Sequence, residues 1–250
     1  YEVGEEMTTA ELNVAVGVRA LGGDAGAALT GNSNVALGYY AFSKLQGTGT
    51  ENVAVGKGSG LNATTTSGSI FIGQNAGRDL TTGNQNIAIG LNAMYDGVVT
   101  GDNNIAIGAH AGDALTSGYS NIVMGEDTGG ALTTGYRNVL LGPNAATAWD
   151  AEHDNIGIGY DALGGGINGG DYLVAVGSSA LAGAVTTDGA VAIGYKAATA
   201  LTTGIKTVAI GYTALQNQTT GNRNTAIGYG AMFTADAGED FNVVIGSEAG

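Results

Sequence analysis

Apolar and polar residues alternate in a short pattern that recurs along the whole chain. In most copies two branched aliphatic residues flank a small residue and a glycine follows, as in Ile87-Ala88-Ile89-Gly90. Large and small side chains that alternate with a period of two predict a short β-strand whose two faces meet different surroundings. No segment repeats its apolar residues with the 3.6-residue period of a helix, so we expect an all-β protein.

The repeat has a nearly constant length. Its glycine, the anchor glycine of each repeat, recurs after a first gap of 21 residues at spacings of 17 or 18 residues. The fourteen anchor glycines are Gly17, Gly38, Gly56, Gly73, Gly90, Gly108, Gly125, Gly142, Gly159, Gly177, Gly194, Gly211, Gly228 and Gly246. Such regularity predicts a solenoid in which each repeat forms one coil and buries apolar residues against its neighbours. We expect a parallel β-roll or β-helix of about 14 coils, as a single repeat domain over residues 1–250 and a fragment of a longer fibre chain.

The other positions of the repeat suit the corners of a coil. The anchor glycine allows the positive φ and close backbone approach of a tight corner. An alanine usually follows three residues later, often with a large apolar residue behind it, which predicts a second short strand. The coil closes with Thr-Thr-Gly or a relative, as at residues 81–83. Asparagine stands four residues before the anchor in ten copies, where it tolerates left-handed backbone and its amides can form a ladder between coils.

Composition narrows the classes of partner. The chain has 46 glycines, one proline, no cysteine and a net charge of −14. The absence of cysteine excludes disulfides and thiolate metal sites. A nucleic-acid partner is not expected, because phosphate binding needs clusters of Lys and Arg. Membrane insertion is not expected either, because no apolar run reaches the roughly 20 residues of a membrane helix.

Several stretches resemble known families. Residues 86–90 and 224–229 (Asn-Thr-Ala-Ile-Gly-Tyr) resemble the head repeats of YadA-like trimeric autotransporter adhesins. The longer form Thr-Thr-Gly-Asn-x-Asn-x-Ala-Ile-Gly, at 81–90 and 219–228, also looks like repeats of bacteriophage tail fibres. The resemblance implies a left-handed roll, a homotrimer, and binding to a host or target cell-surface molecule, either glycan or protein. Adhesin heads use a shorter coil, so the tail-fibre type fits better.

A physical argument also favours a trimer. If the interior of the roll takes mainly alanine, the branched residues of each strand need burial elsewhere, and three copies packed around a shared axis would supply it. The sequence leaves open whether the branched face points into the roll or toward that axis.

These observations favour a structural and adhesive segment of an extracellular fibre. We expect a phage tail fibre that mediates host attachment, outside the cell or on the virion. The head of an adhesin on a bacterial cell surface is the alternative. An ice-binding β-helix is a remote third, since adjacent threonines of a strand point to opposite faces instead of forming one flat rank. We expect neither an enzyme nor a cofactor, because repeated coils offer no unique polar cluster.

A tyrosine follows the anchor glycine in several coils. These residues are Tyr39, Tyr160, Tyr195, Tyr212 and Tyr229. The last four fall nearly in one column, which Ser178 interrupts. Exposed aromatic rings stacked in a column could contact sugar rings. Alternatively, the rings pack on neighbouring coils and present their hydroxyls to water.

Two further motifs contain residue types that occur in metal sites or dinucleotide sites. His153 stands between Glu152 and Asp154, but adjacent residues of a turn rarely converge on one metal ion, so we expect no metal site. Residues 164–169 match G-x-G-x-x-G, yet the motif lacks the helix that a dinucleotide fingerprint opens.

Three segments depart from the repeat consensus, at 22–28, 144–154 and 164–172. Insertions in solenoids form surface loops, so these are the places where we expect specific recognition.

Overall fold

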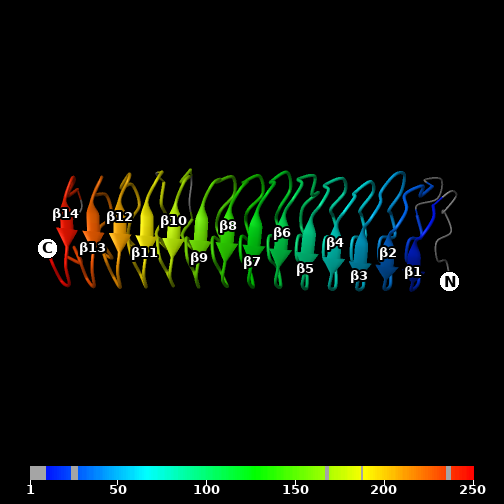
Figure 1. Cartoon of the computed structure of the whole chain (residues 1–250), viewed down its shortest axis with the longest axis horizontal. Helices are drawn as coiled ribbons and strands as arrows, with labels where there is room; N and C mark the ends of the chain where they lie inside the picture. Colours follow the sequence, from blue (N-terminus) through cyan, green and yellow to red (C-terminus); the bar gives the residue numbers. More distant parts are fainter. Residues whose placement is uncertain (1–9, 24–27, 167–168, 187, 235–237) are drawn as a thin grey trace. The chain divides into compact units, whose positions relative to one another are not determined.

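The computed structural model describes residues 10–23, 28–166, 169–186, 188–234 and 238–250. In these ranges fourteen three-residue strands form the regular structure, each preceding an anchor glycine (Figure 1). The strands are β1 (Val14–Val16), β2 (Val35–Leu37), β3 (Val53–Val55), β4 (Ile70–Ile72), β5 (Ile87–Ile89), β6 (Ile105–Ile107), β7 (Ile122–Met124), β8 (Val139–Leu141), β9 (Ile156–Ile158), β10 (Val174–Val176), β11 (Val191–Ile193), β12 (Val208–Ile210), β13 (Thr225–Ile227) and β14 (Val243–Ile245).

Each strand pairs in parallel with the next strand along the chain. The chain divides into two compact units, residues 1–123 (unit 1) and 124–250 (unit 2), and the division falls within β7. In unit 1, β1 to β6 pair in chain order. In unit 2, β8 to β14 do the same. Equivalent residues of successive coils lie opposite one another, as Ile87 and Ile105 do. The expected all-β parallel solenoid is therefore confirmed, with one strand in each coil.

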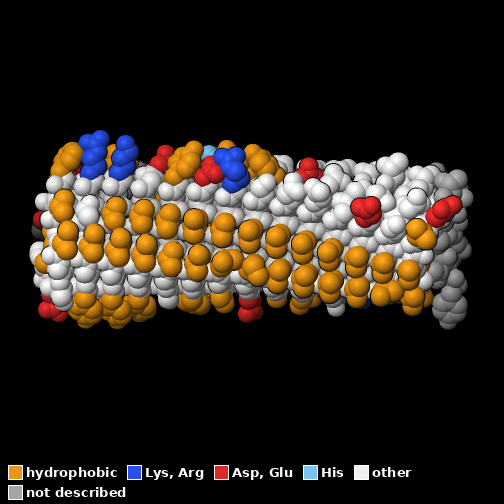
Figure 2. Space-filling view, in the orientation of Figure 1, with side chains coloured by type: hydrophobic (Ala, Val, Ile, Leu, Met, Phe, Trp, Pro, Cys, Tyr) orange, Lys and Arg blue, Asp and Glu red, His pale blue; other side chains and the backbone are white. Residues whose placement is uncertain are grey.

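The small residue of each strand points into the coil. Ala88 and Ala106 are fully buried, whereas the branched residues that flank them are partly exposed. In each unit these outward residues form two apolar rows over the strands (Figure 2). The branched face therefore points away from the interior of the roll.

Large residues from the corners fill the interior. The fourth residue after the anchor is often large and buried, as Phe42 and Leu163 are. Large residues at this position and at the inward strand position exclude one another in some coils: Phe71 faces Gly77, and a methyl group added to Gly77 would lie 2.5 Å from the Phe71 ring. Conversely, Gly157 of β9 makes room for Leu163. Such exchanges of size keep the interior closely packed.

The prediction of a second strand after the anchor glycine is wrong. In every described coil the second and fourth residues after the anchor have positive φ, as Asn92 (54°) and Met94 (50°) do after Gly90. Strand residues need negative φ, so this segment forms a series of turns. The turns still bond successive coils, because Asn92 N–H donates to Gln74 O (3.0 Å) and Met94 N–H donates to Ala111 O (3.1 Å). These hydrogen bonds offset the cost of left-handed backbone, about 1–2 kcal/mol per residue.

The asparagine ladder is confirmed, but its backbone conformation was mispredicted. Asn86, Asn104 and Asn121 are fully buried. The Asn104 amide donates to Asn86 Oδ1 (3.1 Å) and to Gly118 O (2.8 Å), and Asn121 Nδ2 donates to Asn104 Oδ1 (3.0 Å). The residue with positive φ is the one before the asparagine, Asn103 in this coil. The asparagine therefore closes the corner with its side chain rather than with its backbone.

Among the described residues, no helix has the length and apolar character needed to cross a membrane.

We expect Gly90→Ala to destabilise the fold by at least about 2 kcal/mol. Gly90 has a φ of 135°, and the added methyl group would lie 2.4 Å from Gly108 O. Urea denaturation followed by circular dichroism measures the change. Gln74→Ala, at an exposed position in the same unit, is the control and should shift stability by less than about 0.5 kcal/mol. Equal stability of the two variants would contradict this account of the corner.

Asn104→Ala should cost about 3 kcal/mol, because it leaves the Gly118 carbonyl and the buried amides of the ladder without partners. Thermal unfolding of this variant, compared with that of exposed Thr82→Ala, measures the contribution of the ladder. A melting temperature equal to that of Thr82→Ala would show that the ladder contributes no stability.

Candidate functional site

Three of the four predicted tyrosines form a stack in unit 2. Each follows the anchor glycine at the end of a strand, so the parallel register of β11, β12 and β13 places them on successive coils. The ring centroids of Tyr195 and Tyr212 lie 5.0 Å apart with an interplanar angle of 23°. Those of Tyr212 and Tyr229 lie 5.4 Å apart at 8°. These three residues form the tyrosine stack.

The tyrosine stack is packed and exposed at the same time. The exposed fractions of Tyr195, Tyr212 and Tyr229 are 40%, 49% and 54%. The Lys196 ammonium lies 5.4 Å from the centroid of the Tyr195 ring. No described residue hydrogen-bonds to the phenolic hydroxyls of the stack. The rings therefore pack on those of neighbouring coils, while part of each side chain stays exposed.

Tyr160 stands outside the stack. It is 56% exposed, but Ser178 takes the equivalent place in the next coil, and no ring contact joins Tyr160 to another described residue. Tyr39, in unit 1, contacts only Tyr40 among the described aromatic residues, with ring centroids 4.5 Å apart. The predicted column of four is thus a stack of three and one separate tyrosine.

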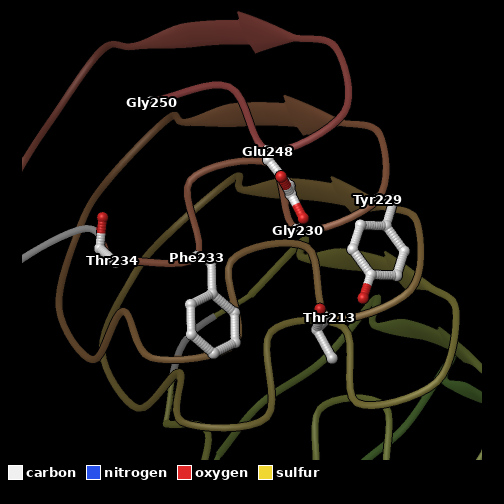
Figure 3. Close-up of a pocket in the computed structure, with 7 residues that line it drawn as sticks. All are labelled: Thr213, Tyr229, Gly230, Phe233, Thr234, Glu248 and Gly250. Atoms are coloured by element: carbon white, nitrogen blue, oxygen red, sulfur yellow. The ribbon is translucent and has the colours of Figure 1, made fainter.

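A hollow of about 300 Å³ adjoins the end of the tyrosine stack. The rings of Tyr229 and Phe233 flank it, and the Glu248 side chain points into the space between them (Figure 3). Thr213 lies beside the Tyr229 hydroxyl in the same view. The sequence analysis missed Phe233 and Glu248, because neither residue type recurs at its position in the other coils. Aromatic rings beside a carboxylate and hydroxyls can hold a sugar, which has both apolar C–H faces and hydroxyl donors.

The neighbourhood of His153 ties three coils together. His153 Nδ1 lies 2.8 Å from Asp171 Oδ1, and its ring lies between Tyr136 and Tyr172, with centroid distances of 4.5 and 5.8 Å. Within the described ranges, no group of three His, Asp or Glu side chains is arranged to hold a metal ion. The contacts of His153 therefore hold neighbouring coils together.

The Asp154 carboxyl pairs with the Arg137 guanidinium of the preceding coil. The hydrogen bonds from the Arg137 guanidinium hold the pKa of the Asp154 carboxyl below its usual value. Arg137 also lies 4.5 Å from the centroid of the Tyr136 ring. The pair is exposed, so it orients the corner more than it stabilises the fold.

Glu152, which the sequence analysis considered only beside His153 as a possible metal ligand, is a buried carboxylate. It is 4% exposed. Its Oε2 accepts hydrogen bonds from the N–H groups of Asp150 (2.9 Å) and Ala151 (3.0 Å), and its Oε1 accepts one from Gly169 (3.1 Å). Glu152 therefore has a structural role, because its hydrogen bonds hold the corner of segment 144–154, which departs from the repeat consensus.

Parts of two other departures lie outside the described residues. These parts are residues 24–27 of segment 22–28 and residues 167–168 of segment 164–172, and the latter belong to the G-x-G-x-x-G match. The described Gly164 and Gly165 lie close to backbone or side-chain atoms of neighbouring turns.

The adjacent threonines of the closing corner lie in irregular turn structure and not in a strand. The first threonine is half-buried and bonds along the ladder: Thr202 Oγ1 donates to Thr219 O (2.9 Å). The second, Thr203, is exposed.

Comparison with known proteins adds no assignment: no family model matches the chain, and no curated protein matches it.

Proposed function

We propose that this chain is a structural and adhesive segment of an extracellular fibre, most closely a phage tail fibre that attaches to a host-cell surface molecule. The tyrosine stack carries the proposal. Half-exposed, parallel rings held by the strand register provide a rigid surface that binds without paying for the ordering of loops. A surface glycan is the ligand class that fits such rings, together with the hollow beside Tyr229.

The head of a bacterial surface adhesin is the second candidate, because the same repeat and the same exposed stack would serve it. A membrane anchor elsewhere in the full-length protein would favour the adhesin. A place on the virion, or in a phage gene neighbourhood, would favour the tail fibre.

We also propose that the chain associates with two further copies of itself into a homotrimer. The outward positions of the described strands are all apolar except Thr225, and none is charged. Ile158 and Ile193 of unit 2 are 36% and 39% exposed. An uncharged apolar surface of this kind marks an interface, and other copies of the same chain present a matching one.

Combined Tyr195→Ala and Tyr212→Ala substitutions should weaken binding to the target cell about tenfold or more, since an aromatic contact contributes about 0.5–1.5 kcal/mol beyond its buried area. Flow cytometry with labelled protein and intact cells measures the effect. Tyr160→Ala removes an equally exposed ring outside the stack and should leave binding unchanged. Unchanged binding by the double variant would remove the stack as the contact surface.

Ile193→Glu should convert the proposed trimer into monomers, because it places a charge within the apolar outward rows. Sedimentation velocity at micromolar concentration measures the mass. Thr203→Glu adds the same charge at an exposed corner of the same unit and should stay trimeric. A monomeric wild-type protein would refute the trimer.

A further inference from the structure

A second hollow lies in unit 1, on the turns that follow β2, β3 and β4. Its volume is about 370 Å³. The residues around it are Tyr39, Tyr40, Lys57, Gly58, Leu61, Asn75 and Arg78. It belongs to a different unit from the tyrosine stack.

Gly58 creates this hollow. The second residue after each anchor has positive φ and belongs to one column, in which Tyr40, Gly58, Asn75 and Asn92 follow one another. Gly58 has no side chain, so a gap opens between Tyr40 and Asn75. A methyl group on Gly58 would lie 2.7 Å from Asn75 Oδ1. Asn75 Nδ2 donates to Asn92 Oδ1 (3.1 Å), which leaves Asn75 Oδ1 directed at the gap as an acceptor.

The charge of the hollow is opposite to that of the chain. The chain has 22 acidic and 8 basic residues, yet two of the basic residues, Lys57 and Arg78, line the hollow and no acid does. Lys57 is exposed, and no described carboxylate pairs with its ammonium. Asp79 follows Arg78, but its carboxylate accepts a hydrogen bond from Asn62. Two cations that line one hollow, with no acidic residue in its lining, favour an anionic ligand.

Arg78 is held in place for such contacts. Its Nη1 donates to Tyr95 Oη (2.7 Å), and its guanidinium carbon lies 5.2 Å from the centroid of the Tyr95 ring. A guanidinium has five N–H donors, so others remain for a ligand. A side chain fixed in this way loses little conformational entropy on binding.

Tyr39 and Tyr40 form the apolar wall. Tyr39 is 50% exposed, and the two ring centroids lie 4.5 Å apart at an interplanar angle of 58°. The Arg19 guanidinium carbon lies 5.6 Å from the centroid of the Tyr40 ring. The hollow therefore combines an aromatic wall, an amide acceptor and two cations.

We infer that this hollow binds an acidic sugar residue, with the sugar ring against Tyr39 and its carboxylate or sulfate group between Lys57 and Arg78. Asn75 Oδ1 accepts a hydrogen bond from a sugar hydroxyl. The inference extends the proposed attachment function to a second, charge-selective site. The site itself is independent of the tyrosine stack, so either can fail without the other.

Isothermal titration calorimetry of the full chain with a galacturonic acid trisaccharide tests the inference. A sulfated galactose trisaccharide and neutral galactotriose are the parallel probes. We expect binding of at least one acidic probe, weaker binding at 500 mM than at 50 mM salt, and none of galactotriose. The stronger acidic probe identifies the anionic group as carboxylate or sulfate.

Gly58→Asn is the sharpest variant. Asparagine tolerates left-handed backbone and occupies the same position in the next two coils, so the corner should fold and the hollow should be filled. We expect loss of acidic-sugar binding with an unchanged melting temperature. Lys57→Gln should weaken binding about tenfold. Lys206→Gln makes the same charge change in unit 2 and should have no effect.

The inference is overturned if neither acidic probe binds at millimolar concentration or if galactotriose binds equally well. Full binding by a folded Gly58→Asn variant would overturn it too, because the ligand would then lie elsewhere. Retained acidic-sugar binding in Tyr212→Ala would show that the hollow acts separately from the tyrosine stack.

Discussion

Hydrogen bonding between successive coils is the interaction on which the rest of the structure depends. A three-residue strand has too few ladder bonds to be stable alone, and a single coil cannot bury its own apolar residues. The stack solves both problems, because the ladder continues beyond the strand into the turns and into the asparagine side chains. Backbone that would be irregular in a globular protein is therefore satisfied at nearly every corner.

This ladder restricts each position of the repeat. The anchor glycine approaches the next anchor so closely that a Cβ atom would overlap its carbonyl. The inward strand residue contacts the fourth residue after the anchor, so a large residue at one position requires a small one at the other where the two meet, as at Gly157 and Leu163. The outward strand residues escape both restrictions, and they carry the branched side chains.

The sequence predicted the elements that repeat and missed those that occur once. Strand positions, register and the amide ladder all follow from the periodic pattern around residues such as Asn104 and Gly90. The turn after the anchor was misassigned because alternating signs of φ leave no trace in hydrophobicity, and leucine at positive φ contradicts its usual preference. Tyr212 was found because tyrosine recurs in its column. Lys57, Gly58 and Glu248 have neighbours from other coils that no shared motif connects, so only the structure could bring them together.

The corner after each strand separates what the backbone requires from what the surface presents. Its second residue keeps the same left-handed conformation, whether it is Tyr40, Lys196, Thr213 or Gly230. Chemical identity at this point can change by single substitutions while the chain path stays constant. Selection for a new target would therefore act on single side chains that stand on a constant backbone. A lineage could alter its binding partner in this way without first acquiring a new loop.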